Sequence, residues 1–388
     1  MRGCIKKRYK GTYSVIFDVE TDAGQRKRKW VTVKGTRDDA QTKLNELLRQ
    51  LDLHTYVDAS KMTLAEWLTE WLALAKTRLR PATVTRYEAI ITQRLTTASI
   101  GRMPLQKLRA SHVEAYYASQ TVSPATLMLD HAILHAALKK AVRDTLVPAN
   151  VVANLDGRPK SGRRKWDEAE KHAWSAREAA AFLAVVKKDT PQTAAFYAMA
   201  LDTGMRKGEL GGLRWANVDL DAGTVRVIEQ LRKTGSEPEW GPPKTDSSVR
   251  TIQIDAETVA LLRGHKRTQA EIKLKNRGTY TDHGLVFAKE WTDVRRHGET
   301  LGQPLQLNNL GQRDYAKFIE AANVRRIKFH GLRHTCATLL LQAGTPVHIV
   351  SARLGHAKVA MTMEVYAHVL ESDQKQAAET LGALLYRR

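Results

Sequence analysis

The first residues of the chain alternate between apolar and polar side chains, as a half-buried strand requires. Residues 11–20 place an apolar side chain at every second position: Tyr13, Val15, Phe17 and Val19. Residues 29–33 repeat this pattern, and the leucines that follow at helical spacing predict a helix capped by Asp38 or Asp39. We therefore predict that residues 1–60 form a small three-stranded β-sheet with one helix.

The apolar period becomes helical from Lys61 onward. The start signals of four helices follow one another along this part of the chain: the capping box Thr63–Glu66, Pro81, the capping box Ser111–Glu114, and Pro124. His131 and His135 have the i,i+4 spacing of a metal-binding pair, but no third ligand candidate lies near them, so a structural role is favoured. Residues 61–156 are predicted to form an all-helical bundle.

A short basic segment separates this bundle from the rest of the chain. Residues 157–165 contain five basic and no acidic side chains, with two glycines and a proline, a composition that cannot form a packed core. We predict a basic linker over residues 157–172. Residues 173–388 combine helical patterns with a short β-region between Thr224 and Ile254, which predicts a mainly α domain with a small antiparallel sheet. The predicted fold class is multidomain α+β.

The charge of the chain points to a polyanionic partner. Its 62 Lys and Arg residues outnumber 41 Asp and Glu residues and give a formal net charge of +21, while 43% apolar content indicates that most of the chain folds. A basic β-ribbon backed by one helix has a shape that fits the major groove of double-stranded DNA, and a basic linker can lie along its phosphate backbone. The basic residues expected to contact it lie in the predicted sheet and the linker: Lys6, Lys7, Arg8, Arg26, Lys27, Arg28, Arg163, Arg164 and Lys165.

Cysteine usage and hydropathy argue against several other classes of protein. Cys4 and Cys336 show no paired spacing, so neither a disulfide framework nor a cysteine zinc site is expected. No run of about 18 apolar residues occurs, and no apolar signal segment lies near Met1, so membrane spanning and export are not expected. A reducing compartment such as the cytoplasm fits these features, and we expect no metal and no other cofactor.

Four stretches of the last segment each place a cation, a proton donor or a nucleophile at a predicted helix end or turn. Gly204 breaks a helix, so Arg206 is expected at the start of the next one, with Glu209 close enough to hold it. Lys244 lies in a turn between two strands. The other candidates occupy two further motifs: His330 and Arg333 in His-Gly-Leu-Arg-His, and His356 in Leu-Gly-His followed by Tyr366.

Together these motifs resemble the active site of the tyrosine recombinases, the phage integrase family of site-specific DNA recombinases. Thr-Gly-x-Arg-x-x-Glu, His-x-Leu-Arg-His, Leu-Gly-His and a downstream tyrosine occur at family-like spacing, and none of the six catalytic positions departs from the pattern. The resemblance implies a catalytic domain over residues 173–388 that ends in an exchanged helix. Residues 61–156 are similar to the family's core-site-binding domain, and residues 1–60, more loosely, to the arm-binding domain of its heterobivalent members.

The residue types themselves suit cleavage of a phosphodiester. Its transition state gathers negative charge on the non-bridging oxygens, and the two guanidiniums of Arg206 and Arg333 can bind this charge bidentately. The ordinary pKa of a tyrosine is near 10, so Tyr366 is ionised to only about one part in a thousand at pH 7 and needs a base. We expect His330 to accept its proton or to be its hydrogen-bond partner, and His356 to donate to a non-bridging oxygen.

The family resemblance adds the leaving group and the biological process. In the family a lysine protonates the leaving 5′ oxygen, which assigns this role to Lys244, with Lys233 of the same hairpin as the alternative. The resemblance implies integration and excision of a mobile element, such as a viral genome, through a covalent 3′-phosphotyrosyl intermediate. It also implies a homotetramer on DNA core and arm sites, assisted by an accessory directionality or DNA-bending protein.

Two other functions stay open from the sequence alone. A DNA-binding regulator without catalysis explains the charge and the helices, but it gives no reason for six catalytic residues to be present. A type IB topoisomerase uses a similar nucleophile and cation set, although the separate N-terminal sheet favours a recombinase. Among other nucleophiles, Cys336 lies in an apolar helix and Tyr315 precedes the His-x-x-Arg motif, so neither is favoured over Tyr366.

Overall fold

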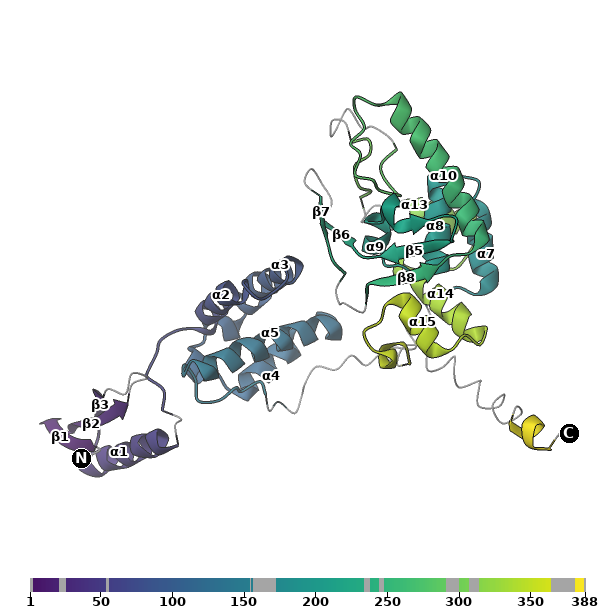
Figure 1. Ribbon diagram of the computed structural model, residues 1–388. Helices are drawn as coiled ribbons and strands as arrows, with labels where there is room; N and C mark the ends of the chain where they lie inside the picture. The colour runs from purple at the N-terminus through teal and green to yellow at the C-terminus, as the bar shows by residue number, and fades with distance from the viewer. Residues whose placement is uncertain are drawn as a thin grey trace. The chain divides into compact units, whose positions relative to one another are not determined.

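The chain divides into two compact units, Met1–Gly162 and Arg163–Arg388, which we describe one at a time (Figure 1). The computed structural model describes residues 3–20, 26–53, 56–153, 155, 172–233, 238–243, 248–290, 300–306, 314–363 and 381–386. The boundary between the units falls inside the predicted linker. Within these ranges, no helix has both the length and the apolar character needed to cross a bilayer.

The first unit begins with a three-stranded antiparallel sheet. Its strands lie in the order β1 (Gly3–Tyr9), β2 (Thr12–Glu20) and β3 (Arg26–Lys34). Helix α1 (Arg37–Asp52) packs against one face and encloses a small apolar core: Val15, Phe17, Ala40, Leu44 and Leu47. The predicted sheet with one helix is confirmed.

The cap of α1 differs from the prediction. Thr36 is the N-cap, and its hydroxyl accepts a hydrogen bond from the backbone N–H of Asp39 at 3.2 Å. The Asp39 carboxylate in turn accepts from the backbone N–H of Thr36 at 2.7 Å. Asp39 is therefore the returning partner of a capping box and not the cap itself.

The second part of the first unit is the predicted helical bundle. Its elements are α2 (Leu64–Ala75), α3 (Pro81–Ile90), η1 (Ile91–Leu95), η2 (Ser99–Arg102), η3 (Leu105–Lys107), α4 (Ala110–Ser119) and α5 (Pro124–Arg143). Thr63 and Glu66 form the predicted capping box, and Pro81 and Pro124 are the first residues of their helices. Trp67 is buried in the core and donates to the carbonyl of Ala137 at 3.0 Å.

One predicted helix start in the bundle is wrong. Helix α4 begins at Ala110, so Ser111 lies inside it and does not cap it. The N-cap is Arg109, whose backbone N–H donates to Nδ1 of His112 at 3.2 Å. A histidine ring nitrogen can accept this bond as a carboxylate would. The predicted cap, Ser111, therefore lies two residues after the actual cap, Arg109.

The bundle also buries polar side chains that hold its helices together. Asp130 is fully buried, accepts from the Tyr116 hydroxyl at 2.8 Å and pairs with Arg94. Burial raises the pKa of Asp130, while these two partners oppose the change. His131 lies 3.0 Å from the Tyr117 hydroxyl, which is the structural role expected for it.

The second unit is mainly helical and contains two small antiparallel sheets. Strands β4 (Val218–Asp219), β5 (Thr224–Val227) and β8 (Arg250–Gln253) form one sheet in the order β4-β5-β8, and β6 (Gln230–Lys233) pairs with β7 (Glu239–Gly241). The helices are α7 (Ala176–Val186), α8 (Pro191–Thr203), α9 (Lys207–Gly211), η4 (Trp215–Asn217), α10 (Ala256–Lys275), α13 (Asp314–Ala321), α14 (His330–Gln342) and α15 (Val347–Leu354). This arrangement confirms the predicted α+β fold class.

Candidate active site

Arg206 lies in a turn between two helices, as its sequence predicts. Gly204 ends α8 in the left-handed conformation (φ +61°), and a Cβ atom there would lie 2.7 Å from the Leu354 side chain. Only glycine suits both the dihedral angle and the close approach. Arg206 is then the N-cap of α9, and its Nη1 donates to Oε1 of Glu209 at 2.8 Å.

Arg333 lies in α14 and connects this helix to the turn after α8 and to the end of α15. It lies one turn into α14, on the same face as His330, the first residue of that helix. The residue is 4% exposed, and its guanidinium donates to the carbonyls of Gly204 and Leu354, both at 2.8 Å. The buried cation therefore joins α14 to the C-terminal ends of α8 and α15.

His356 follows the end of α15. Gly355 terminates this helix with φ +68°, and its carbonyl accepts from Nη2 of Arg206 at 3.4 Å. Nδ1 of His356 lies 2.7 Å from Oγ1 of Thr362, a buried residue. This contact orients the imidazole beside Arg206 and Arg333.

Burial, together with the neighbouring arginines, keeps the two histidines of the cluster neutral at pH 7. Burial lowers the pKa of His330 to about 4, with further lowering by Arg333 and Arg206. Burial likewise lowers the pKa of His356 to about 4, and Arg333 and Arg206 again add to the effect. At pH 7 the cluster therefore presents two guanidiniums and two uncharged imidazoles, a set able to bind one anion and to move a proton.

Glu209 is buried between two arginines. It is 1% exposed; besides Arg206, its carboxylate accepts from Arg250, with Nη2 of Arg250 at 2.9 Å from Oε2. Burial works against its ionisation, but hydrogen bonding and charge from Arg250, followed by Arg206, keep the pKa of Glu209 below its ordinary value. Glu209 is thus an ionised carboxylate that holds Arg206, as the sequence predicted, and Arg250, which it did not.

Comparison with known proteins identifies the family. Residues 174–373 match the phage integrase family, and residues 63–119 match the N-terminal SAM-like domain of phage integrases. The chain belongs to the phage integrase family. This integrase is a tyrosine-type site-specific recombinase.

Relatives of the integrase resemble it over most of their length. A XerC-like tyrosine recombinase of Caldanaerobacter subterraneus subsp. tengcongensis is 27% identical over 369 residues, which cover 90% of each chain. An integrase of Streptomyces ambofaciens is 27% identical over 85% of this chain and 82% of its own. The integrase of transposon Tn1549, solved with circular intermediate DNA, has the same fold, with a TM-score of 0.64 at 21% identity over 82% of this chain and 99% of that one.

Two of the predicted catalytic residues lie outside the described residues. Lys244 falls between Pro243 and Ser248, and Tyr366 follows Met363, where the described ranges stop. Lys233, the alternative to Lys244, ends β6, and its side chain is likewise outside the described set. The cluster seen in the integrase therefore contains four of the six candidates: Arg206, His330, Arg333 and His356.

The competing nucleophiles have structural roles. Cys336 is 4% exposed, and burial raises the pKa of its thiol to about 11. Tyr315 is 2% exposed and packs among aromatic rings, and burial raises the pKa of its hydroxyl. His334 stands against His330, with ring centres 5.0 Å apart, and burial lowers the pKa of His334 to about 4.

The basic residues of the sheet divide between its two faces, because cross-strand partners share a face. Lys6 pairs with Ser14 and Arg28 with Asp18, on the face opposite α1, where Trp30 is 57% exposed. Arg26 is on this face too, whereas Lys7 and Lys27 share the face of α1 through their partners Tyr13 and Val19. Arg8 is exposed at a break in the β1 register. Arg163, Arg164 and Lys165 are outside the described residues.

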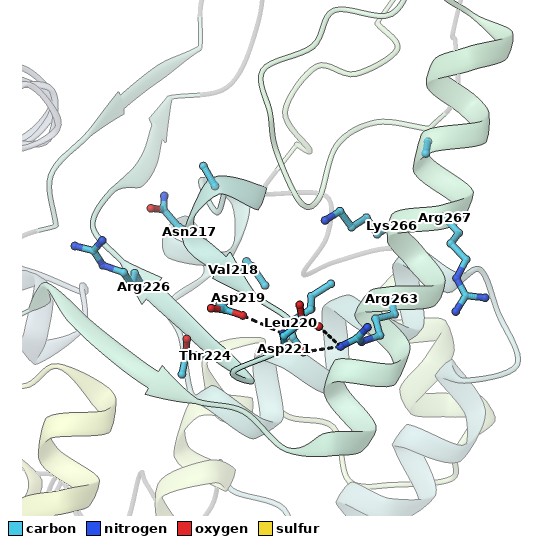
Figure 2. Close-up of a pocket in the computed structure, with 12 residues that line it drawn as sticks. Asn217, Val218, Asp219, Leu220, Asp221, Thr224, Arg226, Arg263, Lys266 and Arg267 are labelled. Atoms are coloured by element: carbon cyan, nitrogen blue, oxygen red, sulfur yellow. Dashed lines mark hydrogen bonds and ion pairs between the residues drawn. The ribbon is translucent and has the colours of Figure 1, made fainter.

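A broad open hollow of about 850 Å³ lies elsewhere in the second unit, between β4, β5 and α10 (Figure 2). Two acidic side chains at its edge are held by local hydrogen bonds: Arg263 donates to Asp221 at 2.6 Å, and Asp219 accepts from the backbone N–H of Asp221 at 3.0 Å. The four clustered candidates do not line it. The hollow is therefore distinct from the candidate active site.

The neutral histidines should make the stability of the integrase sensitive to acid. An unfolded histidine binds a proton near pH 6.5, whereas folded His330 and His356 do so only near pH 4. Unfolding therefore takes up protons between these values, and the free energy of unfolding should fall as the pH falls from 6.5 towards 4. We expect urea titrations at pH 7.5 and 5.0 to show this fall, and a smaller fall in His330→Gln. An equal fall in both proteins would remove His330 from this account.

Removal of the Glu209 carboxylate should destabilise the integrase strongly. Glu209→Ala leaves two arginines without their shared partner, which typically costs about 3 kcal/mol or more for a buried pair. Because the folded pKa is lowered, this stabilisation is present above the unfolded carboxyl pKa and is lost as the pH falls through the folded pKa. Denaturant unfolding at pH 7.5 measures the change.

Glu257→Ala is the matched control for this substitution. The Glu257 side chain is 80% exposed and pairs with Lys187 at 3.4 Å, so its loss should cost less than about 0.5 kcal/mol. Equal stability losses in the two variants would show that Glu209 has no special role in the fold.

Proposed function

We propose that this integrase integrates and excises a mobile element by cutting and rejoining DNA through a 3′-phosphotyrosyl bond to Tyr366. The observation that carries the proposal is the convergence of Arg206, Arg333, His330 and His356 from three helix ends. Guanidiniums are suited to bind the oxygens of a phosphodiester bidentately. A non-catalytic DNA-binding protein has no need of such a buried, preorganised cluster.

The phosphate is the part of the substrate that this cluster recognises. Arg206 and Arg333 face the non-bridging oxygens and stabilise the negative charge that develops there as the tyrosyl oxygen attacks phosphorus. His356 adds a hydrogen bond to one of these oxygens. Arg333 is held by two backbone carbonyls and Arg206 by Glu209, so neither guanidinium needs to reorganise during the reaction.

The proton transfers follow from the protonation states of the side chains. A neutral His330 is able to accept the Tyr366 proton, and the positive charges of Arg206 and Arg333 favour the tyrosinate. Together they reduce the handicap of about 4 kcal/mol that a tyrosine has at pH 7. The tyrosyl oxygen forms a bond to phosphorus as the bond to the 5′ oxygen breaks, and Lys244 gives that oxygen its proton. The reaction exchanges one phosphoester for another, so rejoining the strands requires no external energy source.

The other parts of the chain supply DNA binding and assembly in this proposal. Residues 1–60 bind arm sites, 61–156 bind core sites, 157–172 run along the backbone as a basic linker, and 173–388 catalyse. The solved lambda integrase tetramer on a Holliday junction shares the fold at a TM-score of 0.52, and we propose the same tetrameric state here, with an accessory directionality or DNA-bending protein. Residues 381–386, whose Leu384 is 77% exposed, suit a helix donated to a neighbouring protomer.

Two lysines test which face of the N-terminal sheet meets the arm DNA. Lys6 lies on the open face and Lys7 on the face of α1. Each phosphate contact contributes about −0.9 to the slope of log K against log salt, so Lys6→Ala should make the slope less negative by about this amount. Lys7→Ala reports on the face of α1, and it leaves the slope unchanged if the open face alone meets the DNA. Titrations with a short duplex from the element's attachment region measure both, and the reverse result would assign the other face.

A cleavage assay tests the function as a whole. The full-length protein is incubated with a nicked duplex that carries the element's own core site, so that the released strand drifts away and the covalent complex accumulates. We expect a complex that survives denaturation, and no relaxation of a supercoiled plasmid without the site. Site-independent relaxation would instead indicate a topoisomerase, and the absence of any complex would contradict the proposal.

A further inference from the structure

Arg250 contacts two segments that carry proposed catalytic residues, the start of α9 and the turn that ends α15. It is the first residue of β8, opposite Val227 of β5, and its side chain is only 7% exposed. Nη2 and Nη1 donate to the carboxylate of Glu209 at 2.9 and 3.3 Å. Nε donates to the carbonyl of Arg353 at 2.6 Å, and Nη1 also donates to the carbonyl of Ser248 at 2.9 Å.

The contact with Glu209 extends to Arg206. Glu209 accepts from Arg250 on one side, and from both Nη1 and the backbone N–H of Arg206 on the other, at 2.8 and 2.9 Å. Each of these bonds joins charged partners or a helix cap, which makes them strong and directional. The orientation of the Arg206 guanidinium therefore depends on Arg250 through the shared carboxylate.

The contact with Arg353 extends to His356. Between these two residues lies Gly355, where a Cβ atom would lie 2.9 Å from Nη1 of Arg250. The guanidinium thus packs directly against the backbone turn that ends α15 and presents the histidine. The carbonyl of Gly355 also accepts from Arg206 at 3.4 Å, so Arg206 and Arg250 both contact this turn.

We propose that Arg250 is a positioning residue for DNA cleavage, an inference that rests on the proposed function. It fixes Arg206 and His356 relative to each other and does not itself touch the phosphate. A misplacement of about 1 Å in such a site costs on the order of 100-fold in rate. Arg250→Met should therefore lower the single-turnover cleavage rate by about 100-fold and leave DNA affinity within about twofold.

The titration of His356 gives a second readout that a general loss of stability would not move. Its lowered pKa is due first to burial and then to Arg333, Arg206, Arg250 and His330. The pKa of His330 is lowered by burial, Arg333 and Arg206. In Arg250→Met we expect the pKa of His356 to rise above about 4, because one of the positive charges that lower it is lost while its burial stays, as followed by NMR of ¹³C-labelled histidine.

The variants are compared as full-length proteins on a nicked duplex with the element's own core site, mapped from the junction of the integrated element. Arg226→Met is the matched control, because Arg226 is an exposed arginine on the neighbouring strand β5. We expect this variant to cleave DNA at the wild-type rate. Arg250→Lys keeps the charge but loses the planar fork, and it should lose on the order of 10-fold in rate. It also provides the test if Arg250→Met does not fold.

The outcomes separate this inference from the proposed function. Wild-type cleavage rates in folded Arg250→Met or in Arg250→Lys would overturn the positioning role. So would equal losses in Arg226→Met and Arg250→Met, since that would indicate a general effect of positive charge. An unchanged pKa of His356 in Arg250→Met would also overturn the positioning role. If the wild-type protein forms no covalent complex, the proposed function fails instead.

Discussion

Tyr366→Phe is expected to abolish covalent attachment to DNA and to leave DNA affinity unchanged. The substitution removes one oxygen and keeps the size and shape of the ring, so only the nucleophile is lost. The nicked core-site duplex reports attachment on a denaturing gel, and a mobility-shift titration reports affinity. A complex formed by Tyr366→Phe at the wild-type rate would remove Tyr366 from the mechanism.

Tyr315→Phe is the matched control for this experiment. The Tyr315 hydroxyl is buried and has no hydrogen-bond partner within the described part of the chain, so its removal leaves no broken bond. Its ring stacks on Tyr197 with centres 5.8 Å apart, and phenylalanine preserves that packing. Full activity is expected, and a loss equal to that of Tyr366→Phe would make Tyr315 a rival nucleophile.

Arg333→Ala is expected to lower the cleavage rate by about 1,000-fold, the upper range for loss of one preorganised charge-stabilising donor. The variant loses a buried cation at the phosphate and leaves the carbonyls of Gly204 and Leu354 without that donor. Single-turnover kinetics on the nicked duplex measure the rate. A decrease below about tenfold would mean that Arg333 serves the fold alone.

Two further variants separate charge from packing at Arg333. Arg333→Lys keeps the positive charge but lacks the planar guanidinium, so its single ammonium group cannot bind both carbonyls and the phosphate at once. We therefore expect a rate between those of the wild type and Arg333→Ala. Arg263→Ala is the control. Like Arg333, Arg263 donates to a backbone carbonyl, and it pairs in addition with the Asp221 carboxylate, but it lies on α10 at the hollow (Figure 2). It should cleave at the wild-type rate.

Local sequence signals predict the elements of this fold well. The capping box at Thr63 and the prolines at 81 and 124 mark helix starts that the structure confirms. These signals act within one turn of chain, where the physical cause and the residues are adjacent. The same reasoning misplaced the start of α4, because a histidine at position 112 supplies the acceptor that the pattern sought at Glu114.

The candidate site is only partly visible in the sequence, because its support comes from distant residues. The motif residues reveal their chemistry through short spacings such as His330 to Arg333. Arg250 is 41 residues from Glu209 and lies in an ordinary strand, so no local pattern connects them. Thr362, the partner of His356, is likewise unremarkable by sequence. Tertiary contact alone shows that Glu209 serves two arginines.

The most direct test of the account is to identify the residue joined to DNA. The wild-type complex trapped on the nicked duplex is digested with nuclease and protease, and the modified peptide is sequenced by mass spectrometry. We expect a nucleotide linked through its 3′ phosphate to the oxygen of Tyr366. A link to any other residue, or one through a 5′ phosphate, would contradict it.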